Sequence, residues 1–404
     1  MRYDFETMPD RRGKDAIAWD AIGMPGAPAA PKEGFAPIPM WVADMNFATC
    51  PAIQEAIVRR TQHPAFGYFA ASKAYYEAII RWQTEHNGAA GLQRKHIGYE
   101  NGVLGGVMST LGALCSRGDK VLLQSPTYIG FTEALHNSGY EIVHNPLVRD
   151  GNGIWRLDYE DLERKITENR IHATIFCNPH NPCGRVWEPE EIRRAMAIFE
   201  KHQVWVISDE IWSDILLDGN RHTPTQSVSD YAREHTAAFY APSKTFNLAG
   251  LVGSYHIIYG DWLRERQAKE ASLCEYNTMN VLSMHALIGA YTPDGEEWVK
   301  ELNETLSENV RYACGQVSNW PGITVQKPQG TYMLFLQCGE WCREHGKTLD
   351  ELLKMGTDVG VAWQDGRLFQ DPWGIRMNLA LPLFKVKEAF ERLNRYVFRV
   401  NPAE

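Results

Sequence analysis

The sequence of 404 residues lacks a long apolar run, a C-x-x-C cysteine pair and a basic tail. The nearest apolar run, NGVLGGVMSTLGALCS at 101–116, is rich in Gly and Ser and too short to span a bilayer. The first residues, MRYDFETMPDRRGKDAIAWD, are too polar for a secretory signal. A net charge of −9 argues against nucleic-acid binding. We therefore expect no membrane and no nucleic-acid partner.

The spacing of the eight cysteines excludes the common cysteine sites. No two have the spacing of a zinc or redox motif, and a chain of this length needs no disulfide staples. Cys338 and Cys342 have helical spacing, which we interpret as core packing. The pattern predicts no metal site and fits a reducing, cytoplasmic location. The cysteines are at positions 50, 115, 177, 183, 274, 314, 338 and 342.

The middle third of the chain alternates between short apolar segments and amphipathic ones. The clearest helix is expected at 188–202, where Ile192, Ala195, Met196 and Phe199 recur at helical spacing. Such alternation predicts an α/β fold with a largely parallel sheet that helices cover on both faces. The expected buried strands are 120–126, 141–147, 172–179, 204–210, 237–244 and 252–260.

Composition also suggests how the chain divides. Residues 26–39 form a connector rich in Pro, Ala and Gly, and after about residue 290 long helices replace the strand–helix rhythm. We expect an N-terminal arm that forms part of a small domain (1–49), a large domain (50–290) and a C-terminal small domain (291–404). No internal repeat is evident.

The stretch FYAPSKTFNLAGL, residues 239–251, places Lys244 among aromatic, small and apolar residues. Burial lowers the pKa of a lysine and makes its amine available for imine chemistry. A tight turn whose lysine reaches out to water would explain the same stretch equally well. The stretch alone does not decide between these interpretations.

Polar residues mark the ends of three of the predicted strands: Asn181, Asp209 and Lys244. In open α/β sheets, ligands bind outside the carboxyl ends of the strands, so one site could hold all three side chains. Tyr128 follows the end of another strand and could add an aromatic ring.

Gly105 and Gly106 stand near the predicted start of a helix within 101–111. Their backbone N–H groups could bind a phosphate there. Close helix packing is the more common reason for such a glycine pair.

A phosphate site, an aromatic ring, a carboxylate, an amide and an amine together describe a pyridoxal phosphate pocket. The chain resembles the fold-type I pyridoxal phosphate enzymes of aminotransferase class I/II, and more narrowly their cystathionine β-lyase (C–S lyase) branch. The resemblance covers about residues 2–398. The motifs that carry it are NPHNPCG, SDE, SKTFNLAGL, MWVADMNF, FGY at 66–68 and GIRMNLALP. It implies a mostly parallel central sheet with a smaller α+β domain.

The resemblance also implies roles for the residues at the strand ends. Lys244 would hold pyridoxal 5'-phosphate as an imine and later move the substrate's α-proton. Asp209 would pair with the pyridinium nitrogen and keep it protonated. Asn181 would hydrogen-bond the phenolic oxygen of the ring and contribute to substrate binding, and Tyr128 would stack on the ring. An N-cap, a turn residue and a core tyrosine are the structural alternatives for these last three.

By the same resemblance, Gly105, Gly106 and Ser243 would hold the phosphate. Tyr68 would reach it from the neighbouring subunit, which implies a homodimer with shared active sites. Arg376 would bind the α-carboxylate of an amino-acid substrate, because its guanidinium can form two parallel hydrogen bonds. Tyr68 could instead be a packing residue, and Arg376 a surface arginine beside an apolar strand.

Three positions depart from the aminotransferase or lyase patterns. Val252 stands where class I aminotransferases carry a phosphate-binding arginine, and the C–S lyase branch also tends to lack that arginine. Trp212, counted among the cofactor-binding residues, replaces a tyrosine or histidine and can donate one N–H but cannot act as a phenol. Asn46 replaces an aspartate that is frequent in the branch.

The sequence therefore predicts a pyridoxal phosphate-dependent C–S β-lyase that converts cystathionine or a related cysteine S-conjugate to pyruvate, ammonia and a thiol. An aminotransferase would use the same residues and is the alternative. A non-catalytic cofactor-binding regulator is a third reading, but such a protein would need a DNA-binding extension or a lost lysine, and neither is present.

Overall fold

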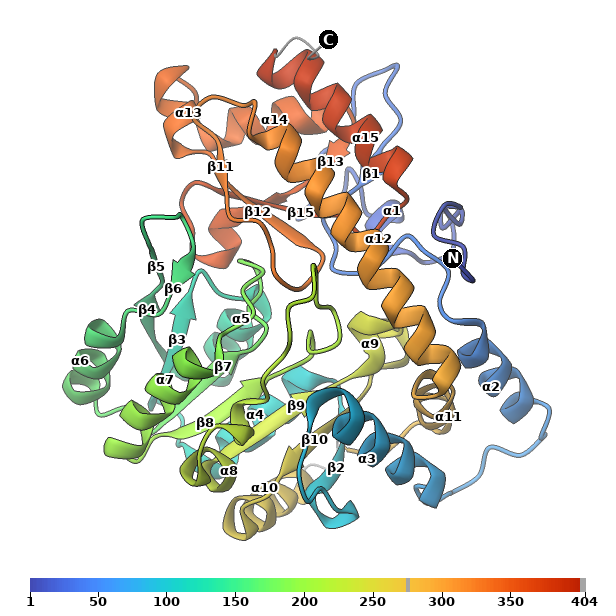
Figure 1. The fold of residues 1–404 in the computed structure, drawn as a ribbon, viewed down its shortest axis with the longest axis vertical. Helices are drawn as coiled ribbons and strands as arrows, with labels where there is room; N and C mark the ends of the chain where they lie inside the picture. Colours follow the sequence, from blue (N-terminus) through green and yellow to red (C-terminus); the bar gives the residue numbers. More distant parts are fainter. Residues whose placement is uncertain (274–276, 400–404) are drawn as a thin grey trace.

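The structure is a computed structural model that describes residues 1–273 and 277–399. A large domain contains a seven-stranded sheet, and a smaller domain built mainly from the C-terminal part of the chain packs on one end of it (Figure 1). This arrangement confirms the predicted α/β class. Of the eight cysteines, Cys274 lies outside the described residues.

The seven-stranded sheet has the order β2-β10-β9-β8-β7-β3-β4. The five strands from β9 to β4 run parallel, while β10 is antiparallel to both of its neighbours. The carboxyl ends of the parallel strands therefore meet at one edge, beneath the small domain. The strands are β2 (Ile97–Asn101), β3 (Lys120–Ser125), β4 (Glu141–Pro146), β7 (Ala173–Cys177), β8 (Trp205–Asp209), β9 (Thr236–Tyr240) and β10 (Gly253–Ile258).

Helices cover both faces of this sheet because its strands are apolar on both sides. Val121 and Leu123 of β3 pack in one apolar cluster, whereas Leu122 between them packs in another. One face is covered by α4 (Val103–Leu114), α5 (Ile129–Ser138) and α10 (Asp261–Leu273), and the other by α6 (Tyr159–Asn169), α7 (Pro189–Lys201) and α8 (Asp230–His235). The apolar residues predicted to face the core from 188–202 are all buried.

The small domain is built on a four-stranded antiparallel sheet of order β11-β12-β15-β14. Its strands are β11 (Thr324–Val325), β12 (Met333–Gln337), β14 (Gln364–Asp365) and β15 (Gly374–Asn378). The 25-residue helix α12 runs from this domain down to the large one (Figure 1). The helices are α12 (Pro293–Val317), α13 (Gly339–Glu344), α14 (Leu349–Asp358) and α15 (Leu383–Arg392).

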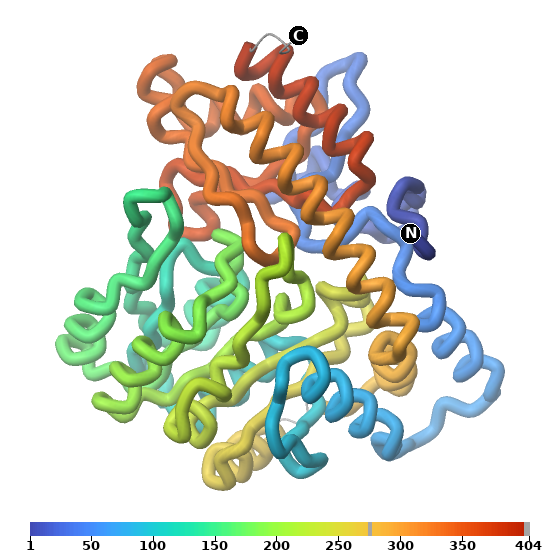
Figure 2. Tube along the Cα trace, in the orientation of Figure 1, coloured from blue at the N-terminus to red at the C-terminus, as the bar shows by residue number. Residues whose placement is uncertain are grey.

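The N-terminal arm lies beside the C-terminal part of the chain (Figure 2). It contains α1 (Ile17–Asp20) and β1 (Ile38–Pro39), and β1 pairs in parallel with β13 (Val361–Ala362). The chain then enters the large domain through α2 (Pro51–Thr61), which packs with α3 (Lys73–Asn87) and α11 (Val281–Ala290). The division of the chain at residues 49 and 290 stays a prediction.

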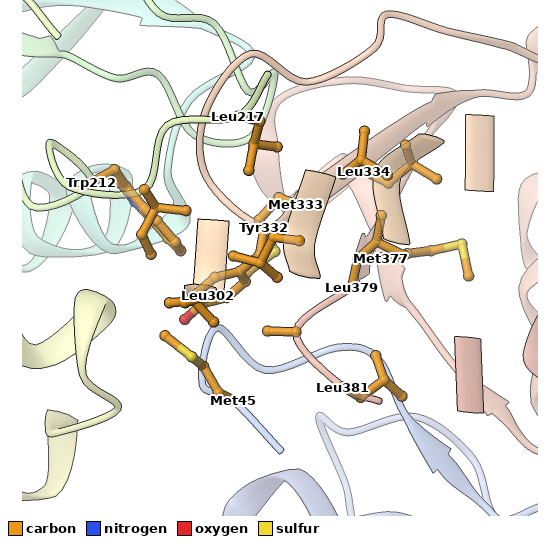
Figure 3. Close-up of a cluster of buried hydrophobic side chains, with 14 of the residues drawn as sticks. Met45, Trp212, Leu217, Leu302, Tyr332, Met333, Leu334, Met377, Leu379 and Leu381 are labelled. Carbon is orange, nitrogen blue, oxygen red and sulfur yellow. The ribbon is translucent and has the colours of Figure 1, made fainter. Parts of the chain in front are cut away.

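One apolar core joins the two domains. In it Trp212 of the large domain meets Tyr332 of the small domain edge to face, with ring centroids 4.7 Å apart. Figure 3 shows both rings near Met45 of the N-terminal arm and Leu302 of α12. Because three separate parts of the chain contribute to this core, it fixes the position of the arm relative to the sheet.

Two of the predicted strand ends are wrong. The predicted strand 237–244 ends at Tyr240, and Lys244 lies in the short helix α9 (Pro242–Thr245). Asn181 lies in a turn beyond the end of β7 at Cys177. Proline explains the first difference, because Pro242 fixes a backbone angle suited to the first turn of a helix and cannot donate to a sheet. Of these three predicted strand-end residues, Asp209 is the one that lies at the end of a strand.

No helix within residues 1–273 and 277–399 is both long and apolar enough to cross a membrane.

Candidate active site

A pocket of about 200 Å³ opens at the carboxyl ends of the parallel strands. Six of the side chains predicted from the sequence line it, and they come from four separate segments of the chain. They are Tyr128, Asn181, Asp209, Trp212, Ser243 and Lys244. The parallel order of β3, β7, β8 and β9 brings these segments together, as the sequence predicts.

Lys244 projects into this pocket from α9. Its Nζ donates to the carbonyl oxygen of Ala43 at 2.8 Å and lies 5.8 Å from the centre of the Trp212 ring. Burial lowers the pKa of Lys244 to about 8, and the nearby Arg376 acts in the same direction. An amine of this kind is partly neutral near pH 7, as a nucleophile or a base must be.

Asp209 ends β8 with its carboxylate in the pocket wall. Its Oδ1 accepts a hydrogen bond from the backbone N–H of Ile211 at 3.0 Å. Burial raises the pKa of Asp209 to about 7. A buried carboxylate with so little neutralisation is the expected partner for a cationic group inside the pocket.

Arg376 of β15 lies behind Asn181 and is 3% exposed. Its Nη1 donates to Asn181 Oδ1 at 3.1 Å, and its Nη2 donates to the carbonyl of Trp41 and to Gln364 Oε1. Its Nε is buried without a partner. Burial lowers the pKa of Arg376 to about 10, so the guanidinium stays charged at neutral pH and can bind a carboxylate.

The bond from Arg376 also fixes the orientation of Asn181. A guanidinium can only donate, so the Asn181 atom that it contacts must be the amide oxygen. The amide nitrogen is then left to donate to a ligand in the pocket. This is the orientation needed to bind a phenolic oxygen.

Two aromatic side chains form walls of the pocket. Tyr128 packs edge to face on Phe131, 5.3 Å between ring centroids, and a Cβ on Gly130 would lie 2.5 Å from its ring. Gly130 therefore permits the close approach of Tyr128. Trp212 is 2% exposed and held by Tyr332, whose hydroxyl donates to the carbonyl of Ala43.

The start of α4 forms the other end of the pocket. Its lining residues are Gly102, Val103 and Leu104, which the sequence did not single out. The first backbone N–H groups of a helix have no partner within the helix and attract anions. Ser243 lines the pocket as well and can donate a hydroxyl hydrogen bond.

The predicted glycine pair differs from this picture. The N–H of Gly106 donates to the carbonyl of Gly102, so the expectation of an open amide there is wrong. A Cβ on Gly106 would lie 2.3 Å from the Phe239 ring, which shows that close packing explains this glycine. Gly105 belongs to the first turn of α4 but is not among the pocket residues.

Tyr68 is not buried in the single chain. It is fully exposed in an irregular segment, and Phe66 beside it is 57% exposed. It is not among the residues that line this pocket.

Sequence reasoning missed the contribution of the N-terminal arm. The carbonyl of Ala43 binds Lys244 and the carbonyl of Trp41 binds Arg376. Both contacts use backbone oxygen, which every residue carries, so no side-chain pattern could indicate them. Cys177, which also lies in the pocket wall, was missed because it resembles the other apolar residues of β7. Gln364 was missed because it lies in the two-residue strand β14, which carries no recognisable motif.

The residues of the pocket fit pyridoxal phosphate. The amine of Lys244, the poorly neutralised carboxylate of Asp209 and the amide of Asn181 border one cavity, and the start of α4 can receive a phosphate. The orphaned Nε of Arg376 adds an unsatisfied donor beside Asn181. No group of three or more His, Cys, Asp or Glu within the described residues could hold a metal ion.

Comparison with known proteins agrees with this reading of the pocket. The family model described as aminotransferase class I and II matches residues 39–393. The curated protein "Cystathionine beta-lyase PatB" of Bacillus subtilis (strain 168) is 32% identical over 398 residues, which cover 96% of this chain and 98% of PatB.

Solved structures give the same result. Cystalysin from Treponema denticola, described as containing a pyridoxal 5'-phosphate cofactor, superposes with a TM-score of 0.90 at 26% identity, covering 99% of this chain and 100% of its own. A pyridoxal phosphate-bound C–S lyase from Staphylococcus hominis superposes with a TM-score of 0.88 at 28% identity, covering 98% of each chain.

Proposed function

Starting from the fact that this chain belongs to the aminotransferase class I and II family of pyridoxal phosphate enzymes, we propose that it is a C–S β-lyase acting on cystathionine or a related cysteine S-conjugate. The observation that carries the proposal is that Lys244, Asp209 and Asn181 line one pocket and that Arg376 binds Asn181 behind it. The similarity to PatB and to the C–S lyase structures favours elimination. The products would be pyruvate, ammonia and a thiol.

Each side chain has a task in that reaction. Arg376 and Asn181 would bind the α-carboxylate and so hold the Cα–H bond at a fixed angle to the pocket. Lys244 would hold the cofactor and take the α-proton on its Nζ. When bound, pyridoxal phosphate supplies an electron-poor ring that accepts the electron pair of the broken bond. Asp209 would pair with the ring nitrogen, which also supplies the positive partner that its buried carboxylate lacks.

An aminotransferase remains the alternative, since the same residues could serve it. Val252 favours the lyase. Val252 lines the pocket, and it occupies the position at which class I aminotransferases carry an arginine for the phosphate. Binding of the cofactor phosphate would then depend on the start of α4, on Ser243 and on a further group outside the pocket of this chain.

We further propose that Tyr68 supplies that group from a second subunit, so that the active unit is a homodimer. A tyrosine that is fully exposed in a single chain, with Phe66 and Phe69 also exposed beside it, is better explained by burial against a second copy. A cytoplasmic location is part of the proposal and rests on the seven described cysteines, all unpaired.

Substrate assays test the proposal. The purified protein, supplied with pyridoxal phosphate, should release pyruvate and thiol from cystathionine or other cysteine S-conjugates with no keto acid present. An amino-group exchange that requires an added keto acid, without thiol release from any conjugate, would favour the aminotransferase.

The Lys244→Ala variant tests the site itself. Borohydride should fix the cofactor covalently to the unaltered chain but not to Lys244→Ala. Fixation to the Lys244→Ala chain would assign the reaction to another lysine.

A further inference from the structure

The N-terminal arm places an ion pair next to the proposed catalytic lysine. The carbonyl of Ala43 accepts the hydrogen bond from Lys244, and the next residue is Asp44. Arg11 holds Asp44, with Nη2 at 2.6 Å from Oδ2, and its Nη1 donates to the carbonyl of Met45 at 2.9 Å. None of these contacts belongs to the roles already assigned.

Two asparagines hold this part of the arm in place. Asn378 donates through Nδ2 to the carbonyls of Val42 and Asp44. Asn247, which lies three residues after Lys244, exchanges two hydrogen bonds with the backbone of Met45, at 2.9 and 3.0 Å. Because Asn247 and Lys244 belong to the same turn of chain, the position of Asp44 relative to the lysine is fixed from both domains.

The carboxylate of Asp44 is only partly neutralised. Its side chain is 16% exposed, and its Oδ1 is buried without a hydrogen-bond partner. A carboxylate in such surroundings acts electrostatically on nearby groups more strongly than one in water. The negative charge of Asp44 raises the pKa of Tyr332 and that of Lys244. Burial has the larger effect on each of these two pKa values.

Three charged groups face Lys244 from three different elements. Burial and Arg376 of β15 lower the pKa of the lysine, while Asp44 of the arm and Asp209 of β8 raise it. In the cofactor-free protein, burial raises the pKa of Asp209 to about 7, so this carboxyl is only partly ionised near neutral pH. Asp44 then remains as the anion that balances Arg376 around the lysine.

We propose that Asp44 is a positioning residue that strengthens the hold of Lys244 on its proton, and that Arg11 limits this effect by binding the same carboxylate. The proposal rests on the function proposed above for Lys244. Its consequence is a pair of opposite effects: loss of Asp44 should make the amine neutral at lower pH, and loss of Arg11 should keep it charged to higher pH.

The test uses attachment of the cofactor, not turnover. Cofactor-free protein is mixed with pyridoxal phosphate over a range of pH, and the rate of covalent attachment is followed by the visible absorption band. Only the neutral amine reacts, so the rate rises through a midpoint set by Lys244. We expect Asp44→Asn to lower this midpoint by roughly 0.5 to 1 pH unit, and Arg11→Gln to raise it by roughly 0.5 unit.

A second ion pair of the same arm provides the matched control. Arg12 and Asp10 are 2.9 Å apart and well exposed, so Arg12→Gln and Asp10→Asn should leave the midpoint unchanged. Asp44→Glu keeps the charge and should restore the midpoint. A structural fault from loosening the arm would move Asp44→Asn and Arg11→Gln in the same direction.

Shifts of equal sign, or shifts no larger than those of the Arg12 and Asp10 controls, would overturn the proposal. If Asp44→Asn does not fold, the upward shift required of Arg11→Gln decides the matter alone. Lys244→Ala separates this question from the function itself. A visible band that still forms in Lys244→Ala would refute the assignment of the lysine, whatever the arm variants do.

Discussion

Arg376 and Asn181 are 195 positions apart in the sequence, yet a hydrogen bond of 3.1 Å joins Nη1 of one to Oδ1 of the other. The bond has two consequences. It leaves the amide nitrogen of Asn181 to donate to a ligand, and it holds the guanidinium of Arg376, whose Nε has no partner, beside that residue. The small and large domains therefore each contribute one side chain to the proposed binding site, and the proposal can be tested from either side.

From the side of Arg376, the substitution to test is Arg376→Lys. A lysine is a point charge on a flexible stem and cannot reproduce the planar guanidinium. We expect KM to rise and kcat to fall together, with kcat/KM lower by roughly a hundredfold, because misorientation costs rate as well as affinity. Steady-state kinetics measure this. The exposed Arg367, bound to Asp350 and Asp365, gives the control Arg367→Lys, which should be near normal.

From the side of Asn181, Asn181→Asp should be more harmful than its small change in size suggests. The new carboxylate would pair with Arg376 and compete with the substrate, and the N–H donor toward the cofactor would be lost. We expect a higher KM together with a shifted visible band of the bound cofactor. A changed KM with an unaltered spectrum would show that the amide does not reach the cofactor.

Asp209 should make the stability of the cofactor-free chain depend on pH. Because burial raises its pKa to about 7, well above the usual range, the folded chain holds this proton more tightly than the unfolded chain. The contribution of Asp209 to the free energy of unfolding therefore falls as the pH rises from about 4 to 7, by roughly 1.4 kcal/mol per pH unit. Asp209→Asn should remove that loss.

Thermal melts of the cofactor-free proteins check this sign. At pH 8 the Asp209→Asn variant should melt above the unaltered chain, and the difference should shrink at pH 5.5. A constant difference would contradict the raised pKa.

With cofactor bound, the same variant should keep pyridoxal phosphate but lose turnover by several orders of magnitude, because the ring nitrogen has no anionic partner.

The sequence predicts those parts of the site that are side chains with unusual surroundings. Lys244 stands out because charged residues are rare around it, and Asp209 because it ends an apolar strand. The parallel sheet follows from the repeated apolar segments, and this was enough to bring Asn181, Asp209 and Lys244 to one edge.

The remaining features depend on long-range contacts between backbone atoms. Nothing in the amino-acid sequence of the N-terminal arm indicates that the carbonyl of Ala43 binds a lysine 201 positions away. The same holds for Gly106, whose absent side chain suits both a phosphate and the neighbouring Phe239 ring. Only the packing of α4 on β9 shows that the ring is the reason.

Shared active sites can be tested by mixing two inactive variants. In a dimer of one Lys244→Ala chain and one Tyr68→Ala chain, one site has both the lysine and the partner tyrosine. The other site has neither. We expect each variant alone to be impaired and the mixture, after dissociation and reassociation, to regain activity. Activity of the separated monomers in sedimentation at assay concentration would contradict the homodimer.

The central claim is that this chain eliminates a thiol rather than exchanging an amino group. The most direct measurement follows the visible spectrum of the cofactor-loaded protein together with pyruvate after addition of cystathionine alone. We expect pyruvate to be released steadily over many turnovers, with the visible band returning when the substrate is consumed. Bleaching of the band to a stable colourless form, without continued release of pyruvate, would contradict the account and identify an aminotransferase.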